Sequence, residues 1–233
     1  MQYLPKGKKR LYNQLIDLQK AIYELDSILE LNWNLDSKQL NKAWNKIYNS
    51  LSKLGYTQED AQKLCLHIKR YEKHECQLRE NKSPLRLNLE YFYYYKSCDV
   101  RLMRQLIMDR IDRYEGRKIK LTDYRYFDLI TEINDDVEDV FEDQTTINAN
   151  AYLITLFDTP KSRCHEVFNN LIELFVNKSE NRLLRQRNKW TIMLNDWTNE
   201  VATDTKALLD KRDNEIDISS IKKSSVLYEH WNQ

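Results

Sequence analysis

The residues with the clearest chemical potential lie in one acidic segment near the middle of the chain. Residues 126–160 contain nine Asp and Glu side chains and no Lys or Arg, although the formal net charge of the whole chain is only +1. On a helix, most of these carboxylates fall on one face and the apolar side chains on the other. The acidic face comprises Asp128, Glu132, Asp135, Asp136, Asp139 and Asp143. We therefore expect an amphipathic helix with stacked carboxylates.

Such a stack is unfavourable for a helix by itself. Like charges three or four residues apart cost roughly 0.2–0.5 kcal/mol per pair, and the helix dipole disfavours anions near the C-terminal end, where this cluster lies. A divalent cation would offset both effects, because Mg²⁺ binds one or two carboxylates together with phosphates and water. We predict a Mg²⁺ site with Asp135, Asp136 and Asp139 as ligands. Glu132 and Asp143 extend the cluster. The alternative is a solvated face, or a surface that docks a basic partner.

A second group of charged residues lies in the helical segment that precedes the acidic one. Lys96, Asp99 and Arg110 fall inside its apolar stripe, where a charge must be paired, metal-bound or solvated. One interpretation is a buried Asp99 that pairs with Lys96 or Arg110. The functional interpretation places Asp99 beside the acidic helix, close to an anionic ligand. The bases that would surround this ligand are Lys96, Arg101 and Arg104.

The same segment carries five consecutive aromatic residues, from Tyr91 to Tyr95. On a helix this run covers every face, so some of the rings must line an interhelical seam or a cavity. Tyr95 lies on the apolar stripe and is a candidate for a cavity wall. The face of such a ring can stabilise a cation, whereas ordinary core packing is the alternative for most of the run.

Capping residues, prolines and glycines divide the chain into about eight helices. Asp36 or Ser37 can cap a helix that Gly55 ends, and the pairs Ser83-Pro84 and Thr159-Pro160 are typical of helix starts. The expected helices run from Leu11 to Leu29, from Ser37 to Gly55, from Thr57 to about Lys82, from Pro84 to Gly116, from Thr122 to about Asp143, briefly from Thr145 or Thr146, from Pro160 to Asn177, and from Ser179 to about Lys211.

These helices are joined by short connections, which favour antiparallel packing of neighbours. The sequence therefore predicts an all-α fold, a compact single-domain bundle over residues 1–211. Residues 212–233 are polar, and apart from Val226, Leu227 and Trp231 we expect them to form a loosely held tail.

The composition excludes several classes of protein. Glycine and proline occur only three times each, too few for the turns of a β-sandwich or for a glycine-rich phosphate loop. The 37 basic and 36 acidic residues nearly cancel, so we expect no nucleic-acid partner. No apolar run approaches the roughly 18 residues of a transmembrane helix. The four cysteines follow no disulfide-framework spacing and the N-terminus has no apolar signal region, so we expect a cytoplasmic protein with free thiols.

The acidic segment resembles a known family. FDLITEINDDVEDVFED is similar to the aspartate-rich helices of class I isoprenoid synthases, which include trans-prenyltransferases, squalene and phytoene synthases and class I terpene synthases. Residues 135–139 fit the DDxxD pattern of these helices. Alternatively, Asn134, Glu138 and Glu142 have the spacing of an NSE motif, with Glu where Ser or Thr is usual. KSCDVRLMRQLI and residues 146–150 also look similar to small bacterial class 1 isoprenoid biosynthesis proteins.

This resemblance covers residues 92–157 and implies an all-α, isoprenoid-synthase-like fold with a central cavity. It implies that Mg²⁺ holds a prenyl diphosphate, that basic side chains pull on the leaving group, and that the allylic diphosphate ionises to a cyclised or condensed isoprenoid. Asp99 would be a second-face ligand or would orient Lys96 or Arg104. The residues assigned to catalysis are Asp99, Arg101 and Arg104, and those assigned to substrate binding are Lys96, Tyr95, Asn148 and Asn150.

The chain also departs from the pattern of this family. It has one full aspartate-rich motif, and residues 195–200 resemble an NSE motif only weakly. A basic stretch could supply diphosphate contacts or form a solvated face; it comprises Arg182, Arg185, Arg187 and Lys189. The alternative function is a non-catalytic helical protein that binds isoprenoids or docks a basic partner through its acidic helix. A homodimer is compatible with either function.

Overall fold

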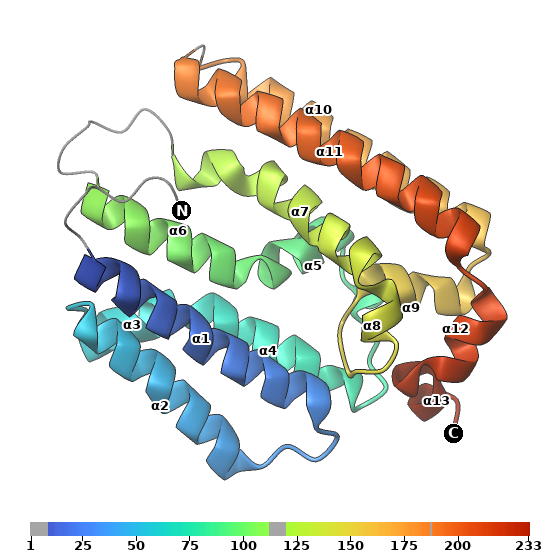
Figure 1. Ribbon diagram of the computed structural model, residues 1–233, viewed down its shortest axis with the longest axis horizontal. Coiled ribbons are helices and arrows are strands. Elements are labelled where there is room, and N and C mark those ends of the chain that lie inside the picture. Colours follow the sequence, from blue (N-terminus) through green and yellow to red (C-terminus); the bar gives the residue numbers. More distant parts are fainter. Residues whose placement is uncertain (1–8, 112–119, 187) are drawn as a thin grey trace.

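The computed structural model describes residues 9–111, 120–186 and 188–233, and within these ranges it is helical without strands (Figure 1). The prediction of an all-α protein is confirmed. The described residues form thirteen α-helices and two short 3-10 helices, so the prediction of about eight helices is wrong. None of the described helices is both long enough and apolar enough to cross a membrane.

The helices of the first half of the chain are α1 (Lys9–Leu31), α2 (Ser37–Lys53), α3 (Gln58–Leu64), α4 (Leu66–Leu78), η1 (Pro84–Arg86), α5 (Leu89–Lys96) and α6 (Cys98–Ile111). Those of the second half are η2 (Leu121–Tyr124), α7 (Arg125–Glu138), α8 (Val140–Asp143), α9 (Ala151–Asp158), α10 (Lys161–Leu183), α11 (Lys189–Glu215), α12 (Ile218–Ser224) and α13 (Val226–Trp231).

Several helix boundaries lie where the capping signals predicted them. Asp36 accepts a hydrogen bond from the backbone N–H of Lys38 at 2.8 Å, and Thr57 accepts one from that of Asp60 at 3.2 Å. Gly55 follows α2 with a φ of 90°, a left-handed conformation that residues with a Cβ rarely adopt. The predicted end at Gly116 lies outside the described residues.

Three of the additional helices arise because predicted helices are interrupted, and α12 and α13 lie in the segment expected to form the tail. Cys65, Ser97 and Asp139 separate α3 from α4, α5 from α6 and α7 from α8. At each break the backbone N–H still bonds to the carbonyl four residues earlier, as from Asp139 to Asp135 at 2.9 Å. Such local distortions leave the spacing of apolar residues nearly unchanged, so the pattern alone does not reveal them.

Several other predicted boundaries are misplaced: the Ser83-Pro84 signal opens only the short η1, and the helix expected from Ser179 begins at Lys189. The short helix expected from Thr145 or Thr146 begins at Ala151, because Asn150 caps it by accepting a hydrogen bond from the N–H of Leu153 at 2.7 Å. The helix expected to end at Asn177 continues to Leu183, which is fully buried.

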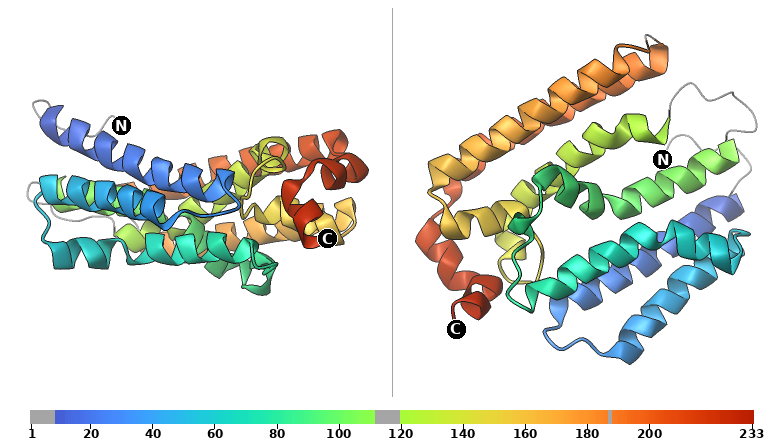
Figure 2. Two further views of the ribbon diagram at one scale, coloured as in Figure 1. Left: turned by 90° about the horizontal axis from the view of Figure 1, so that it is seen from below. Right: turned by 180° about the vertical axis from the view of Figure 1, so that it is seen from behind.

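The buried apolar side chains form two separate clusters. The first, which we call the C-terminal cluster, joins α7, α9, α10 and α11 to the C-terminal helices. The second, the N-terminal cluster, joins α1, α2, α4 and α6. In Figure 1, α10 and α11 run along one edge and α2 along the other. Seen from behind, α5 and α6 lie between α7 and α4 (Figure 2). The acidic helix α7 therefore lies close to the seam between the clusters.

The C-terminal residues 212–233 are packed against the rest of the protein, contrary to the expected loose tail. Ile221 and Leu227 are buried in the C-terminal cluster. The indole N–H of Trp231 donates to the carbonyl oxygen of Leu78 at 2.9 Å. Leu227 and Trp231 were expected to be held, together with Val226, whereas the polar composition around Ile221 concealed that core position. As expected, all four cysteines are free thiols.

Candidate functional site

The acidic face of α7 lines a cavity of about 360 Å³ at the seam between the two clusters. Its lining residues come from α1, α4, α5, α6, α7 and α8, and from the loop that follows α8. Seven carboxylates from separate parts of the chain face it: Asp26, Glu30, Asp99, Glu132, Asp135, Asp139 and Asp143. Among the described residues, Lys96 is the one basic side chain in the lining. The cavity is therefore strongly acidic.

Part of the cavity wall is apolar. It is formed by Ile22, Leu25 and Leu29 of α1, Ile68 of α4 and Val100 of α6. The aromatic rings of Tyr23 and Tyr71 also belong to the lining. An apolar wall beside a small group of convergent polar side chains is the usual construction of a small-molecule site.

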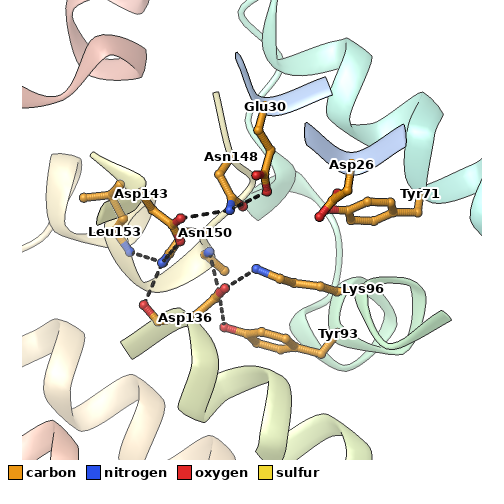
Figure 3. A network of polar contacts seen from close by, with 11 residues as sticks. Asp26, Glu30, Tyr71, Tyr93, Lys96, Asp136, Asp143, Asn148, Asn150 and Leu153 are labelled. Carbon is orange, nitrogen blue, oxygen red and sulfur yellow. Dashed lines mark hydrogen bonds and ion pairs between the residues drawn. The ribbon is translucent and has the colours of Figure 1, made fainter. Parts of the chain in front are cut away.

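The two adjacent aspartates of the DDxxD segment have different surroundings. Asp135 lines the cavity, whereas Asp136 is 1% exposed and lies beneath it. The carboxylate of Asp136 accepts hydrogen bonds from the Tyr93 hydroxyl and the Ala151 backbone N–H, each at 2.8 Å, and pairs with the Lys96 ammonium (Figure 3). Asp136 thus connects α5, α7 and α9. Its contacts make it a structural anchor rather than a cavity ligand.

Asn148 and Asn150 hold the loop after α8 against the cavity. The Asn150 amide donates to Asp143 at 2.8 Å and to the backbone carbonyl of Asp136 at 2.6 Å. The Asn148 amide donates to Asp143 at 3.0 Å and to Glu30 of α1 at 2.9 Å (Figure 3). Asn148 lines the cavity and therefore bridges its α1 and α8 walls. Asn150 is fully buried behind it.

Besides Asp136 and Asn150, three more of the predicted functional residues do not line the cavity. The Arg101 guanidinium lies 3.7 Å from the ring centroid of Tyr94 and donates to the backbone carbonyl of Tyr94. Arg104 pairs with the buried Asp128 at 2.5 Å. Tyr95 is buried but is not part of the lining. Of the predicted bases Lys96, Arg101 and Arg104, only Lys96 lines the cavity with the seven carboxylates.

The interpretation of Asp99 as the partner of Lys96 or Arg110 is wrong. Lys96 pairs with Asp136, and the Arg110 guanidinium donates to the Tyr56 hydroxyl and the Leu54 carbonyl. Asp99 lines the cavity instead, and burial raises the pKa of its carboxyl.

Burial and mutual repulsion raise the pKa values of the cavity carboxyls. Burial, reinforced by Asp26 and Asp143, raises the pKa of Glu30 to about 8. Burial raises the pKa of Asp135 and of Asp143 to about 6, although Lys96 partly opposes it. For Lys96, burial opposes the charge, but Asp136 and other carboxylates outweigh it and raise the pKa. Because one ammonium does not neutralise seven carboxylates, the cavity favours a cationic ligand.

The lining suits Mg²⁺ in chemistry, although no complete metal centre is formed. Within the described ranges, no three Asp, Glu, His or Cys side chains are grouped closely enough to hold a metal ion. Mg²⁺ does not require such a cage, because it is usually bound by one or two carboxylates, substrate phosphates and water. Two buried lining groups have free acceptor oxygens: the side chain of Glu132 has no hydrogen bond or ion pair among the described residues, and the amide oxygen of Asn148 is buried without a partner. These oxygens fit an ion with its water shell.

Sequence reasoning missed the α1 side of this site. Asp26 and Glu30 lie one helical turn apart and alternate with the buried Leu25 and Leu29. They face the acidic helix from more than 100 residues away in sequence. The available signal was two carboxylates flanking core leucines on an otherwise regular amphipathic helix, a pattern that is common on solvated helices.

A further buried acid, Glu75 of α4, lies close to the cavity without lining it. Its side chain is fully buried, and neither carboxyl oxygen has a hydrogen-bond partner, although the Ala149 backbone is close enough to favour the charged form. Burial, reinforced by Asp26, raises the pKa of Glu75 well above its ordinary value. An unsatisfied buried polar group of this kind costs about 1–3 kcal/mol.

Replacing Glu75 with leucine is therefore expected to stabilise the protein by about 1–2 kcal/mol. Urea unfolding followed by circular dichroism measures the change. Glu75→Gln serves as the matched variant, because it keeps the shape and a polar end and should stabilise less than leucine. A loss of stability in Glu75→Leu would show that the carboxyl is satisfied.

We compared the chain with protein-family models, with curated proteins and with solved structures, and none of the three comparisons gave a match.

Proposed function

We propose that this cavity binds Mg²⁺ together with the diphosphate group of a prenyl diphosphate, and that the protein is a class I isoprenoid-synthase-like enzyme. It would ionise the allylic C–O bond and release diphosphate, giving a cyclised or condensed isoprenoid. The observation that supports this proposal best is the convergence of seven carboxylates and one lysine on a cavity with an apolar wall.

The carboxylates could not bind a diphosphate directly, since like charges would repel. Bound Mg²⁺ would neutralise the phosphate oxygens and stabilise the negative charge that grows on the leaving group. Asp135 and Asp139 at the end of α7 are the strongest candidates for holding it, with Asp26 and Glu30 opposite on α1. This arrangement supplies an acidic pair on each of two facing walls.

The remaining lining residues fit the other needs of such a reaction. The Lys96 ammonium, fixed by Asp136, is the one lining base in the described chain that can contact the diphosphate. Ile22, Ile68 and Val100 can cover the prenyl chain and exclude water from a carbocation. The ring of Tyr71 can face that cation, the role that the sequence suggested for Tyr95.

The positions of Arg101 and Arg104 favour a second candidate function, in which the protein binds isoprenoids without turnover. Both guanidiniums are engaged with Tyr94 and Asp128 away from the cavity, so Lys96 alone would assist departure of the leaving group. Docking of a basic partner is supported less well, because only Asp135 and Asp139 of the seven lining carboxylates are exposed and the other five are half-buried or buried.

The proposed site predicts that millimolar Mg²⁺ and pyrophosphate raise the melting temperature by about 5–10 °C, as for a ligand well above its dissociation constant. Asp135→Asn and Asp139→Asn should each remove most of this shift. Glu138→Gln is the matched control, because Glu138 is an exposed acid of the same segment outside the lining. If no shift occurs, or if all three variants behave alike, the proposed site is wrong.

An assay of turnover distinguishes the proposed enzyme from a protein that binds isoprenoids without catalysis. Incubation with geranyl and farnesyl diphosphates in Mg²⁺ should release pyrophosphate and yield hydrocarbon or prenyl products, and Asp135→Asn should abolish both. A Mg²⁺-dependent shift without any product would support binding without catalysis.

A further inference from the structure

The free end of the α10–α11 hairpin carries a surface that the proposed function does not use. Residues 181–194 contain four Arg and Lys side chains and no Asp or Glu. In Figure 1 this end lies at the edge of the molecule, at the upper left. None of its described residues lines the acidic cavity. Arg182, Arg185 and Lys189 are therefore not placed to contact a diphosphate bound there, and they call for another role.

Large apolar side chains are exposed at the same place. Leu184 at the end of α10 is 47% exposed, and Trp190 and Ile192 at the start of α11 are 36% and 48% exposed. Trp190 and Ile192 lie two residues apart on α11 and therefore point to different sides of it; together with Leu184 they place apolar side chains around the end of the hairpin, a set that we call the patch.

Cationic side chains flank this patch. Arg185 and Lys189 are exposed, and neither makes an ion pair with another residue of the described ranges. Arg182 is partly engaged, since it contacts Asp123 at 3.1 Å. One acid borders the patch, since Glu180 shares a surface pocket with Leu184 and Arg185, and Asp196 is the nearest acid along α11. The hairpin end thus combines a net positive charge with exposed apolar and aromatic side chains.

We propose that the end of the α10–α11 hairpin docks on an anionic lipid bilayer. Arg185 and Lys189 would contact lipid phosphates and carboxylates, each contributing electrostatic attraction near the surface. Trp190 would lie at the level of the headgroups, where its ring and N–H are both accommodated. Leu184 and Ile192 would enter the boundary of the acyl chains. A nucleic acid fits less well, because aliphatic side chains gain nothing from its phosphates. This inference is independent of the function proposed for the cavity.

Flotation of the full chain with vesicles tests the proposal. We expect binding to vesicles of phosphatidylcholine with phosphatidylserine, weak binding to pure phosphatidylcholine, and release by high salt. The double variant Arg185→Gln/Lys189→Gln should lower the partition coefficient about tenfold or more. Ile192→Asn should lower it through lost apolar insertion. A blue shift of tryptophan fluorescence on binding should be absent in Trp190→Phe.

Matched controls lie on the opposite edge of the molecule, where Leu31 and Lys42 are also exposed. Leu31→Asn and Lys42→Gln should bind vesicles as the unmodified chain does. The proposal is overturned if the chain floats with neither kind of vesicle, or if it binds vesicles with and without phosphatidylserine equally at every salt concentration. It is also overturned if the partition coefficients of the control variants fall as far as those of the hairpin variants. Binding of the hairpin to RNA but not to anionic vesicles would also overturn it.

Discussion

Replacing Asp136 with alanine is expected to lower the free energy of unfolding by about 3–5 kcal/mol, the typical cost of breaking a buried ion pair. The substitution would leave the Lys96 ammonium, the Tyr93 hydroxyl and the Ala151 N–H without their shared acceptor in a nearly inaccessible place. It would also loosen the connection between α5, α7 and α9. Urea unfolding at neutral pH measures the loss.

The adjacent aspartate provides a close control. Asp135 has the same side chain and lies on the same helix, but it lines the cavity and repels its acidic neighbours. Asp135→Asn should therefore keep or increase the stability of the ligand-free protein. Lys96→Met combined with Asp136→Leu should recover much of the stability lost in Asp136→Ala, since both charges are removed together. Equal losses in the two single aspartate variants would contradict the structural role of Asp136.

Without metal ions, the stability of the protein is expected to fall as the pH rises from about 5 to 8. The pKa of Glu30 is raised by burial from its ordinary value to about 8, so across this window the folded state binds more protons than the unfolded state. Stability then decreases with pH. Glu132 and Glu75, whose pKa values burial also raises, act in the same direction. The combined loss is on the order of a few kcal/mol, or a fall in melting temperature of about 5–10 °C.

Thermal melting in a chelator at a series of pH values checks this expectation. Glu30→Gln should flatten the profile, because its side chain carries no titratable proton. Glu138→Gln, outside the cavity, should leave the slope unchanged. Added Mg²⁺ should stabilise more at pH 8 than at pH 5.5, since the cation competes with protons for the carboxylates. A flat or rising profile in the chelator would contradict the electrostatics of the cavity.

Much of the helical architecture could be predicted because its signals are local. The caps at Asp36 and Thr57 and the left-handed Gly55 act over a few residues, and they lie where the sequence indicated. The breaks at Ser97 and Asp139 could not be predicted, because the helix axis changes direction there while the spacing of apolar residues along the sequence stays the same. The packing of Trp231 on Leu78 depends on contacts more than 150 residues apart.

The candidate site was predictable only on one side. The density of acids in 126–160, without a single base, indicated that the acidic face of α7 was functional, and that face does line a cavity. The sequence could not distinguish Asp135 from Asp136, because both fall on the same helical face and only the position of Lys96 separates them. The contribution of Asp26 and Glu30 depends on how α1 packs, which no pattern within α1 encodes.

The cavity lies where the two apolar clusters meet: its apolar wall belongs to the N-terminal cluster, and α7, whose buried apolar side chains belong to the C-terminal cluster, lies opposite. The width of the cavity therefore depends on the packing of both clusters. A substitution deep in either cluster, far from any carboxylate, would change the shape of the cavity by shifting the helices that form one of its walls. Selection on the chemistry of this chain would then act on remote packing residues as strongly as on the acids themselves.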